Sequence, residues 1–302
     1  MAVKKQTQNE KSLSPPKLQA GKLPAIPSQR SVIPKRLADY MVVIYGMTGI
    51  GKTTLIDKFG SKAFFFRWEA AQKGISLFAT PILGSWDEGV SYIESLEQDR
   101  QGVDHAVFDT GGPAYKRALE YICQREKCAH PSDKNDYGKT WGMVRTEFEN
   151  AQKRFQAIDI GFSVTSHEKI TDRELFDGKT TFRIEPNFSG ACLQFYWEFS
   201  DVIGYYHFAN KQRWLQIVGD DYVMAKSNID NHFYTPSGEK IIRIPMGDSP
   251  DEAYGNLMNA FNNKQEETYF DLSEKKPEKI RQAGFEKKKR DERRAKKSAQ
   301  NR

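Results

Sequence analysis

The sequence predicts an α/β protein with a mostly parallel sheet, helices on both faces of that sheet and an antiparallel hairpin at one edge. Short apolar runs typical of buried strands alternate with longer segments whose apolar residues recur at helical spacing. Such alternation requires right-handed crossovers, which leave the strands parallel and the helices distributed over both faces. A second observation is that the apolar run at 201–208 is followed closely by another at 213–218. That spacing is typical of a hairpin, so we expect one antiparallel edge.

The expected elements follow one another between residues 38 and 262. In the segment 86–98, for example, Val90, Ile93 and Leu96 lie at helical spacing. We expect strands at 40–45, 63–68, 106–112, 158–167, 180–185, 201–208 and 213–218, and helices from 54 onward and at 86–98, 113–125, 140–157, 189–199 and 251–262. The charged segment 168–182 is predicted to be a long loop.

Charge is unevenly distributed along the chain. Residues 1–37 carry a net charge of +7 and residues 275–302 a net charge of +9, which leaves about −10 for residues 38–274. The first segment is rich in Pro, Ser, Gln and Lys and lacks the apolar residues needed for a core. We therefore expect a disordered basic N-terminal segment (1–37), one folded domain (38–262) and a charged, basic C-terminal tail (263–302).

The composition also bears on the cellular compartment. The N-terminal segment has no apolar stretch of the secretory type, and the chain contains no apolar run of eighteen residues. Three cysteines are too few for a disulfide framework. These features predict a cytoplasmic protein that does not enter a membrane.

One motif points to nucleotide binding. Residues 46–53 fit the phosphate-loop pattern G-x-x-x-x-G-K-S/T, between an expected strand and an expected helix. In such a loop, backbone N–H groups at the start of a helix surround the phosphates, the lysine reaches the β- and γ-phosphates, and the hydroxyl holds Mg²⁺. The expected nucleotide-binding residues are Gly46, Met47, Thr48, Gly49, Ile50, Gly51, Lys52, Thr53 and Thr54.

Polar residues follow three other strands of the expected sheet. Ligands of open parallel sheets bind beyond the carboxyl ends of the strands, so Glu69, Asp109 and His167 should converge on the loop. Asp109 is expected to join Thr53 in holding Mg²⁺; its alternative role is a cap on the next helix. Glu69 could polarise the attacking water or stand in the first turn of a helix. His167 could contact the γ-phosphate or simply end its strand.

A cysteine-containing segment allows two interpretations. Cys123, Cys128 and His130 are spaced closely enough to suggest a metal site, with Asp133 as a fourth ligand. Cys123 also falls on the apolar side of an expected helix. We favour a buried thiol over a metal ligand.

The order of these motifs resembles that of the RecA-like P-loop ATPases encoded by bacteriophages, including the single-strand-annealing type. The resemblance covers about residues 38–262 and rests on the segments 43–54, 66–69, 107–110, 164–169, 201–202 and 225–228. It implies that Glu69 is the catalytic base and His167 the γ-phosphate sensor. It also implies that Lys226, with Arg213 as a second candidate, reaches the nucleotide of a neighbouring subunit.

The resemblance implies a Mg²⁺-dependent ATPase of phage DNA recombination, acting in the bacterial host cytoplasm. Such a protein would assemble as a ring or filament on single-stranded DNA and promote annealing or strand exchange. The basic tails are compatible with a polyanionic partner. Two alternatives remain open. One is a P-loop kinase for a small acceptor, in which Arg173 and Arg183 would close over the phosphates. The other is a non-catalytic protein whose 168–182 segment binds a partner when nucleotide is present.

Overall fold

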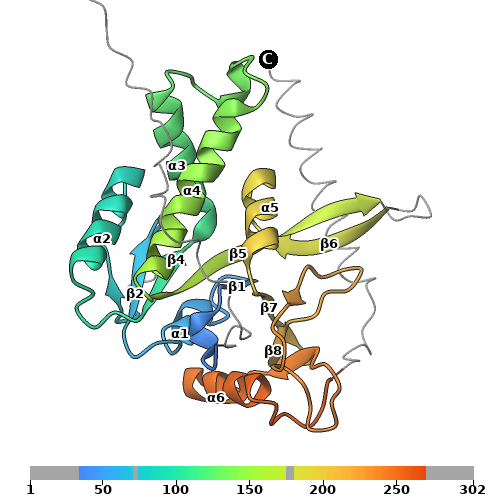
Figure 1. Ribbon diagram of the computed structural model, residues 1–302. Coiled ribbons are helices and arrows are strands. Elements are labelled where there is room, and N and C mark those ends of the chain that lie inside the picture. Colours follow the sequence, from blue (N-terminus) through green and yellow to red (C-terminus); the bar gives the residue numbers. More distant parts are fainter. Residues whose placement is uncertain (1–33, 71–73, 175–179, 270–302) are drawn as a thin grey trace, which may run out of the picture. The chain divides into compact units, whose positions relative to one another are not determined.

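A ten-stranded sheet forms the centre of the structure, a computed structural model that describes residues 34–70, 74–174 and 180–269 (Figure 1). The main path of the sheet has the order β10-β8-β7-β1-β5-β4-β2-β3, with β6 paired to β5 and β9 paired to β7. The strands are β1 (Val42–Gly46), β2 (Ala63–Arg67), β3 (Phe78–Ala79), β4 (His105–Asp109), β5 (Gly161–Glu174), β6 (Thr180–Pro186), β7 (Val202–Ala209), β8 (Gln212–Gln216), β9 (Lys226–Ser227) and β10 (Arg243–Pro245).

The direction of the strands confirms the predicted fold class. From β7 through β1, β5, β4 and β2 to β3, every neighbouring pair is parallel. At the other edge, β8 runs antiparallel to β7 and β10 runs antiparallel to β8. The predicted hairpin is therefore the β7–β8 pair.

Helices cover both faces of the sheet, as predicted. The helices are α1 (Lys52–Ile56), α2 (Trp86–Gln98), α3 (Gly111–Arg125), α4 (Lys139–Ala157), α5 (Gly190–Phe199) and α6 (Pro250–Phe261), with 3₁₀ turns η1 (Leu37–Asp39) and η2 (Pro131–Asp133). Residues of α2, α3, α4 and α5 join one hydrophobic cluster, and residues of α1 and α6 join the other. Figure 1 shows α2, α3 and α4 on one side of the sheet and α1 and α6 on the other.

Strand β1 is buried on both faces because it lies between these two clusters. Val43 and Tyr45 belong to the first cluster, whereas Val42 and Ile44 belong to the second. Side chains alternate between the faces of a strand, so an uninterrupted apolar run is what a central parallel strand requires. The phosphate-loop motif therefore follows directly from a strand in the middle of the sheet.

The segment 168–182 is not the loop that its charges predicted. Strand β5 continues past the sheet to Glu174 and pairs antiparallel with β6 from Glu168 opposite Pro186 to Glu174 opposite Thr180. The prediction gave too much weight to charge, because β-branched residues such as Ile170 and Thr171 favour a strand and the charged side chains from Asp172 to Glu174 are exposed. Residues 175–179 lie outside the described residues.

The predicted terminal segments fall mostly outside the described residues. Residues 263–269, which were assigned to the C-terminal tail, contact the sheet: the N–H groups of Ile242 and Arg243 both donate to the carbonyl of Thr268. The folded domain thus continues past the predicted boundary at 262. Across the described ranges, no helix has the length and apolar character to cross a membrane.

Candidate nucleotide site

The phosphate loop joins β1 to α1 at the carboxyl edge of the parallel strands. Gly51 precedes α1 with φ +111°, a backbone conformation that residues with a Cβ rarely adopt. At Gly46 the chain passes so close to β7 that an added Cβ would lie 2.0 Å from the carbonyl oxygen of Tyr206. Ile50 is buried and anchors the middle of the loop in the core beneath it. The motif therefore folds into a tight loop at the start of a helix.

Lys52 lies within this loop. Its Nζ donates to the carbonyl oxygens of Gly46, at 3.0 Å, and Met47, at 2.9 Å. Burial lowers the pKa of Lys52, and the negative charge of Asp109 opposes that change. The two carbonyls hold the amine against the backbone of the loop.

Asp109 faces the loop from the end of β4. Its carboxylate accepts a hydrogen bond from the Thr53 hydroxyl at 3.2 Å and another from the Thr165 hydroxyl on β5. The alternative role as a helix cap is wrong, because the N-cap residue of α3 is Thr110. Thr165 was not predicted, although its place two residues before His167 on the same strand puts it near this edge.

Glu69 and His167 meet on the other side of the loop. Glu69 Oε1 lies 3.1 Å from His167 Nε2, and His167 Nδ1 lies 3.2 Å from the hydroxyl oxygen of Thr48. The hydrogen bond with His167 is the largest cause that lowers the pKa of Glu69, and the Thr110 hydroxyl and the Lys52 charge act in the same direction. Glu69 lies outside any helix of the described residues, so its first-turn alternative is also wrong.

These contacts connect the loop to two acids. Thr53, Asp109 and Thr165 form one group of oxygen atoms, and Thr48, His167 and Glu69 form a second. The side chains of Glu69 and His167 are 37% and 38% exposed, so water and a bound phosphate can reach them. The three polar strand ends predicted to converge on the loop are thus brought together.

Lys226 is not brought to this site. It lies on β9 opposite Ile203, near the start of β7, whereas the loop residue Gly46 lies opposite Tyr206. Its Nζ donates to the carbonyl of Trp197 and lies 5.2 Å from the centroid of the Trp197 ring. Burial lowers the pKa of Lys226.

Arg213, the second candidate for the cross-subunit role, lies at the carboxyl edge. It is opposite Phe208 in the β7–β8 hairpin, and its guanidinium lies 5.1 Å from the centroid of the Phe208 ring. That edge also carries the phosphate loop, because Gly46 lies opposite Tyr206 of the same β7. Arg213 and Lys226 therefore occupy different ends of the sheet.

The cysteine segment forms a helix end and a turn. Cys123 is buried, and burial together with the neighbouring Cys128 raises its pKa to about 11. His130 Nδ1 accepts from the Ser132 N–H, and Asp133 accepts from the His130 N–H, so these two side chains cap η2. Within the ranges described, no cluster of three His, Cys, Asp or Glu residues suited to a metal ion is found.

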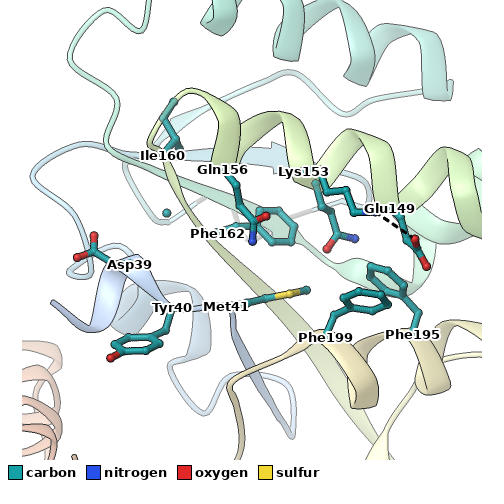
Figure 2. Close-up of a pocket in the computed structure, with 12 residues that line it drawn as sticks. Asp39, Tyr40, Met41, Glu149, Lys153, Gln156, Ile160, Phe162, Phe195 and Phe199 are labelled. Carbon is teal, nitrogen blue, oxygen red and sulfur yellow. Dashed lines mark ion pairs between the residues drawn. The ribbon is translucent and has the colours of Figure 1, made fainter. Parts of the chain in front are cut away.

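A cavity of about 170 Å³ lies at the opposite end of the strands (Figure 2). Figure 2 shows Phe195 and Phe199 of α5 on one side of it and Phe162 of β5 on another. Met41 precedes β1 and Ile160 precedes β5, so the cavity is at the amino ends of these strands. It is therefore separate from the phosphate loop, which follows the carboxyl end of β1.

Comparison with known proteins assigns the family. A family model described as an AAA domain matches residues 38–229, more than half of the chain. The matched range begins where the folded domain was predicted to begin and contains the phosphate loop, Glu69, Asp109, His167 and Lys226. No curated protein matches the chain. The chain belongs to this AAA domain family of nucleotide-binding P-loop ATPases.

Proposed function

We propose that the protein is a Mg²⁺-dependent ATPase of phage DNA recombination that assembles on single-stranded DNA to promote annealing or strand exchange. The observation that carries the hydrolytic part is the pair of acids on neighbouring strand ends, one hydrogen-bonded to Thr53 and the other to His167. Nucleotide binding without hydrolysis would require only the phosphate loop. A half-exposed carboxylate beside the loop additionally supports attack by water.

The residues present fit a magnesium ion. Mg²⁺ prefers oxygen ligands, and the Thr53 hydroxyl and the Asp109 carboxylate lie 3.2 Å apart at the start of α1. When bound, the ion would neutralise charge on the triphosphate. Thr165 donates to the second carboxylate oxygen of Asp109 and so fixes the orientation of that carboxylate.

In the proposed hydrolysis, three side chains have separate roles: those of Lys52, Glu69 and His167. Lys52 supplies positive charge to the phosphate oxygens as negative charge develops there. Glu69 is held ionised by its lowered pKa and can orient and polarise the attacking water. His167 positions Glu69 and connects it to Thr48 in the loop. The presence or loss of the γ-phosphate would therefore affect both His167 and Glu69.

The link to single-stranded DNA is supported by charge and topology. The net charges of +7 and +9 in the two terminal segments give a polyanion places to bind, while the domain between them is acidic. In addition, the β5–β6 hairpin begins directly after His167, so a change at the γ-phosphate would be transmitted to this ribbon. Both features support a nucleotide-dependent contact with a partner.

Turnover measured with single strands, duplexes and no polymer tests the proposal. We expect Mg²⁺-dependent release of phosphate that single-stranded DNA stimulates and that added salt suppresses. Lys52→Ala should lower kcat at least about 100-fold with unchanged circular dichroism. Absence of DNA stimulation and of salt-sensitive DNA binding would remove the recombination part, and absence of turnover under all conditions would remove the ATPase.

A further inference from the structure

The positions of the two acids define the direction in which a bound nucleotide leaves the loop. His167 lies within β5, Asp109 ends β4 and Glu69 follows β2 by two residues, and these three strands all lie on one side of β1. On the other side lie β7 and β8. In an extended nucleoside triphosphate, the γ-phosphate and the base lie at opposite ends. If the γ-phosphate faces the acids, the base must leave toward β7 and β8.

Strand β7 contacts the phosphate loop on that side. An added Cβ at Gly51 would lie 3.7 Å from the Tyr206 hydroxyl oxygen, and Gly46 approaches the Tyr206 backbone even more closely. Phe208 is two residues further along β7, on the same face as Tyr206 and about 7 Å beyond it. Phe208 is 48% exposed, whereas Tyr206 is buried. A large aromatic ring is therefore open to solvent where the base would leave the loop.

The ring of Phe208 is also backed by a cation. The Arg213 guanidinium lies over it, 5.1 Å from the ring centroid. The same guanidinium donates to the carbonyls of Gly247, at 3.5 Å, and Asp248, at 3.3 Å, and lies 3.6 Å from the Asp248 carboxylate. These contacts fix Arg213, and Arg213 in turn holds one side of the ring.

We propose that Phe208 is the platform on which the base of the bound nucleotide stacks, with Arg213 supporting the ring from behind. The ligand class is a heteroaromatic base joined to a triphosphate. This subsite rests on the proposed function, because it takes the placement of the phosphates from it. Stacking uses the flat face of a base, which every base has, so the subsite adds affinity without depending on one hydrogen-bonding edge.

Two ligands separate the contribution of the base from that of the phosphates. The nonhydrolysable analogue AMP-PNP and inorganic tripolyphosphate, each with Mg²⁺, are titrated into the full chain by calorimetry. Phe208→Ala should weaken AMP-PNP binding about 5- to 100-fold, the range expected for one stacked base, and leave tripolyphosphate binding unchanged. Phe208→Trp should restore the affinity for AMP-PNP.

Phe78→Ala is the matched control. Phe78 is 58% exposed on the edge strand β3, with Lys62 Nζ 4.9 Å from its ring centroid, but it lies on the acid side of β1. It should change neither affinity. Equal effects of Phe208→Ala on both ligands, or none on either, would overturn the base subsite alone. Failure of the unaltered protein to bind either ligand would overturn the proposed function, and the subsite with it.

Discussion

Asp109 and Glu69 are both acids at strand ends, but their neighbours give them different roles. Asp109 accepts hydrogen bonds from two threonine hydroxyls, one of them in the phosphate loop. Glu69 instead pairs with an imidazole that itself contacts Thr48 of the loop. The first arrangement fixes the orientation of a carboxylate, as the proposed cation site requires, and the second lowers the pKa of a carboxylate that is open to water. The role of Glu69 is therefore tested by the pH dependence of turnover, and the role of Asp109 by its Mg²⁺ dependence.

The pH dependence of turnover tests the role of His167. The pKa of Glu69 lies below its ordinary value, so activity that needs the ionised form is lost only as the pH falls through that lowered pKa. His167→Ala removes the largest cause of the shift. The Glu69 pKa should then rise, and the acid limb of kcat/KM should move to higher pH.

His130→Ala serves as the control, because His130 caps η2 and contacts none of the loop residues named above. The position of the acid limb is informative even if His167→Ala also lowers the maximal rate. An acid limb that stays in place in His167→Ala would show that this hydrogen bond does not set the protonation on which turnover depends.

The magnesium requirement tests Asp109. Asp109→Asn keeps the shape of the side chain and removes its charge, so the Mg²⁺ concentration for half-maximal turnover should rise about 10- to 100-fold. Turnover is measured against Mg²⁺ at saturating ATP. Asp87→Asn, in the first turn of α2 and exposed, should leave the curve unchanged. An unaltered Mg²⁺ curve for Asp109→Asn would place the cation elsewhere.

At the scale of elements, the sequence predicted an element correctly where the pattern of residues within that one segment is sufficient to define it. Helix α2 was predicted at its observed bounds because its apolar residues keep helical spacing. In the structure, Ser85 caps this helix by accepting from the Glu88 N–H. The two-residue strands β3 and β9 were missed because they are held by their neighbours in the sheet rather than by a pattern of their own. The β5–β6 hairpin was missed because the charges of residues 168–182 were given more weight than its β-branched residues.

The same distinction applies to the site. Glu69, Asp109 and His167 could be found because each follows an apolar strand, and parallel strands end at a common edge. Thr165 and Thr110 were not predicted, since their hydrogen bonds to Asp109 and Glu69 join segments that only the folded chain brings together. The placement of Lys226 also required the structure, because its strand has two residues and pairs antiparallel to β7.

The attachment of α2 to the sheet gives a stability prediction. Trp86 is 2% exposed, stacks on Trp68 with ring centroids 5.5 Å apart, and donates its indole N–H to Glu147 at 3.1 Å. Trp86→Ala should lower the free energy of unfolding by about 3–5 kcal/mol, measured by urea denaturation. The fully exposed Tyr137 provides the control Tyr137→Ala, which should cost far less. Equal losses for the two variants would mean that α2 contributes little to the core.

At the scale of the whole molecule, the sheet separates the nucleotide loop from Lys226. The loop follows the carboxyl end of β1, while Lys226 lies opposite Ile203, three residues or about 10 Å before Tyr206 along β7. Lys226 at this position can contact a bound nucleotide only if the phosphate loop of a second copy of the chain lies next to it. Such a contact joins unlike surfaces, and its repetition gives a ring or a filament.

Mixing two inactive variants tests this arrangement. Lys226→Ala should lower kcat on the order of 10³-fold, the effect of losing a cation supplied by a neighbour, and Lys52→Ala should be inactive through its own loop. In a mixed assembly, a Lys226→Ala copy retains an intact loop, and an adjoining Lys52→Ala copy retains Lys226. Together they complete a site, so the mixture should recover turnover that neither variant has alone. The double variant mixed with Lys52→Ala contains no intact loop and should recover nothing. If the mixture of Lys226→Ala and Lys52→Ala were as inactive as that control mixture, Lys226 would not act on the nucleotide of another copy. The proposed contact between copies would then have no role in catalysis.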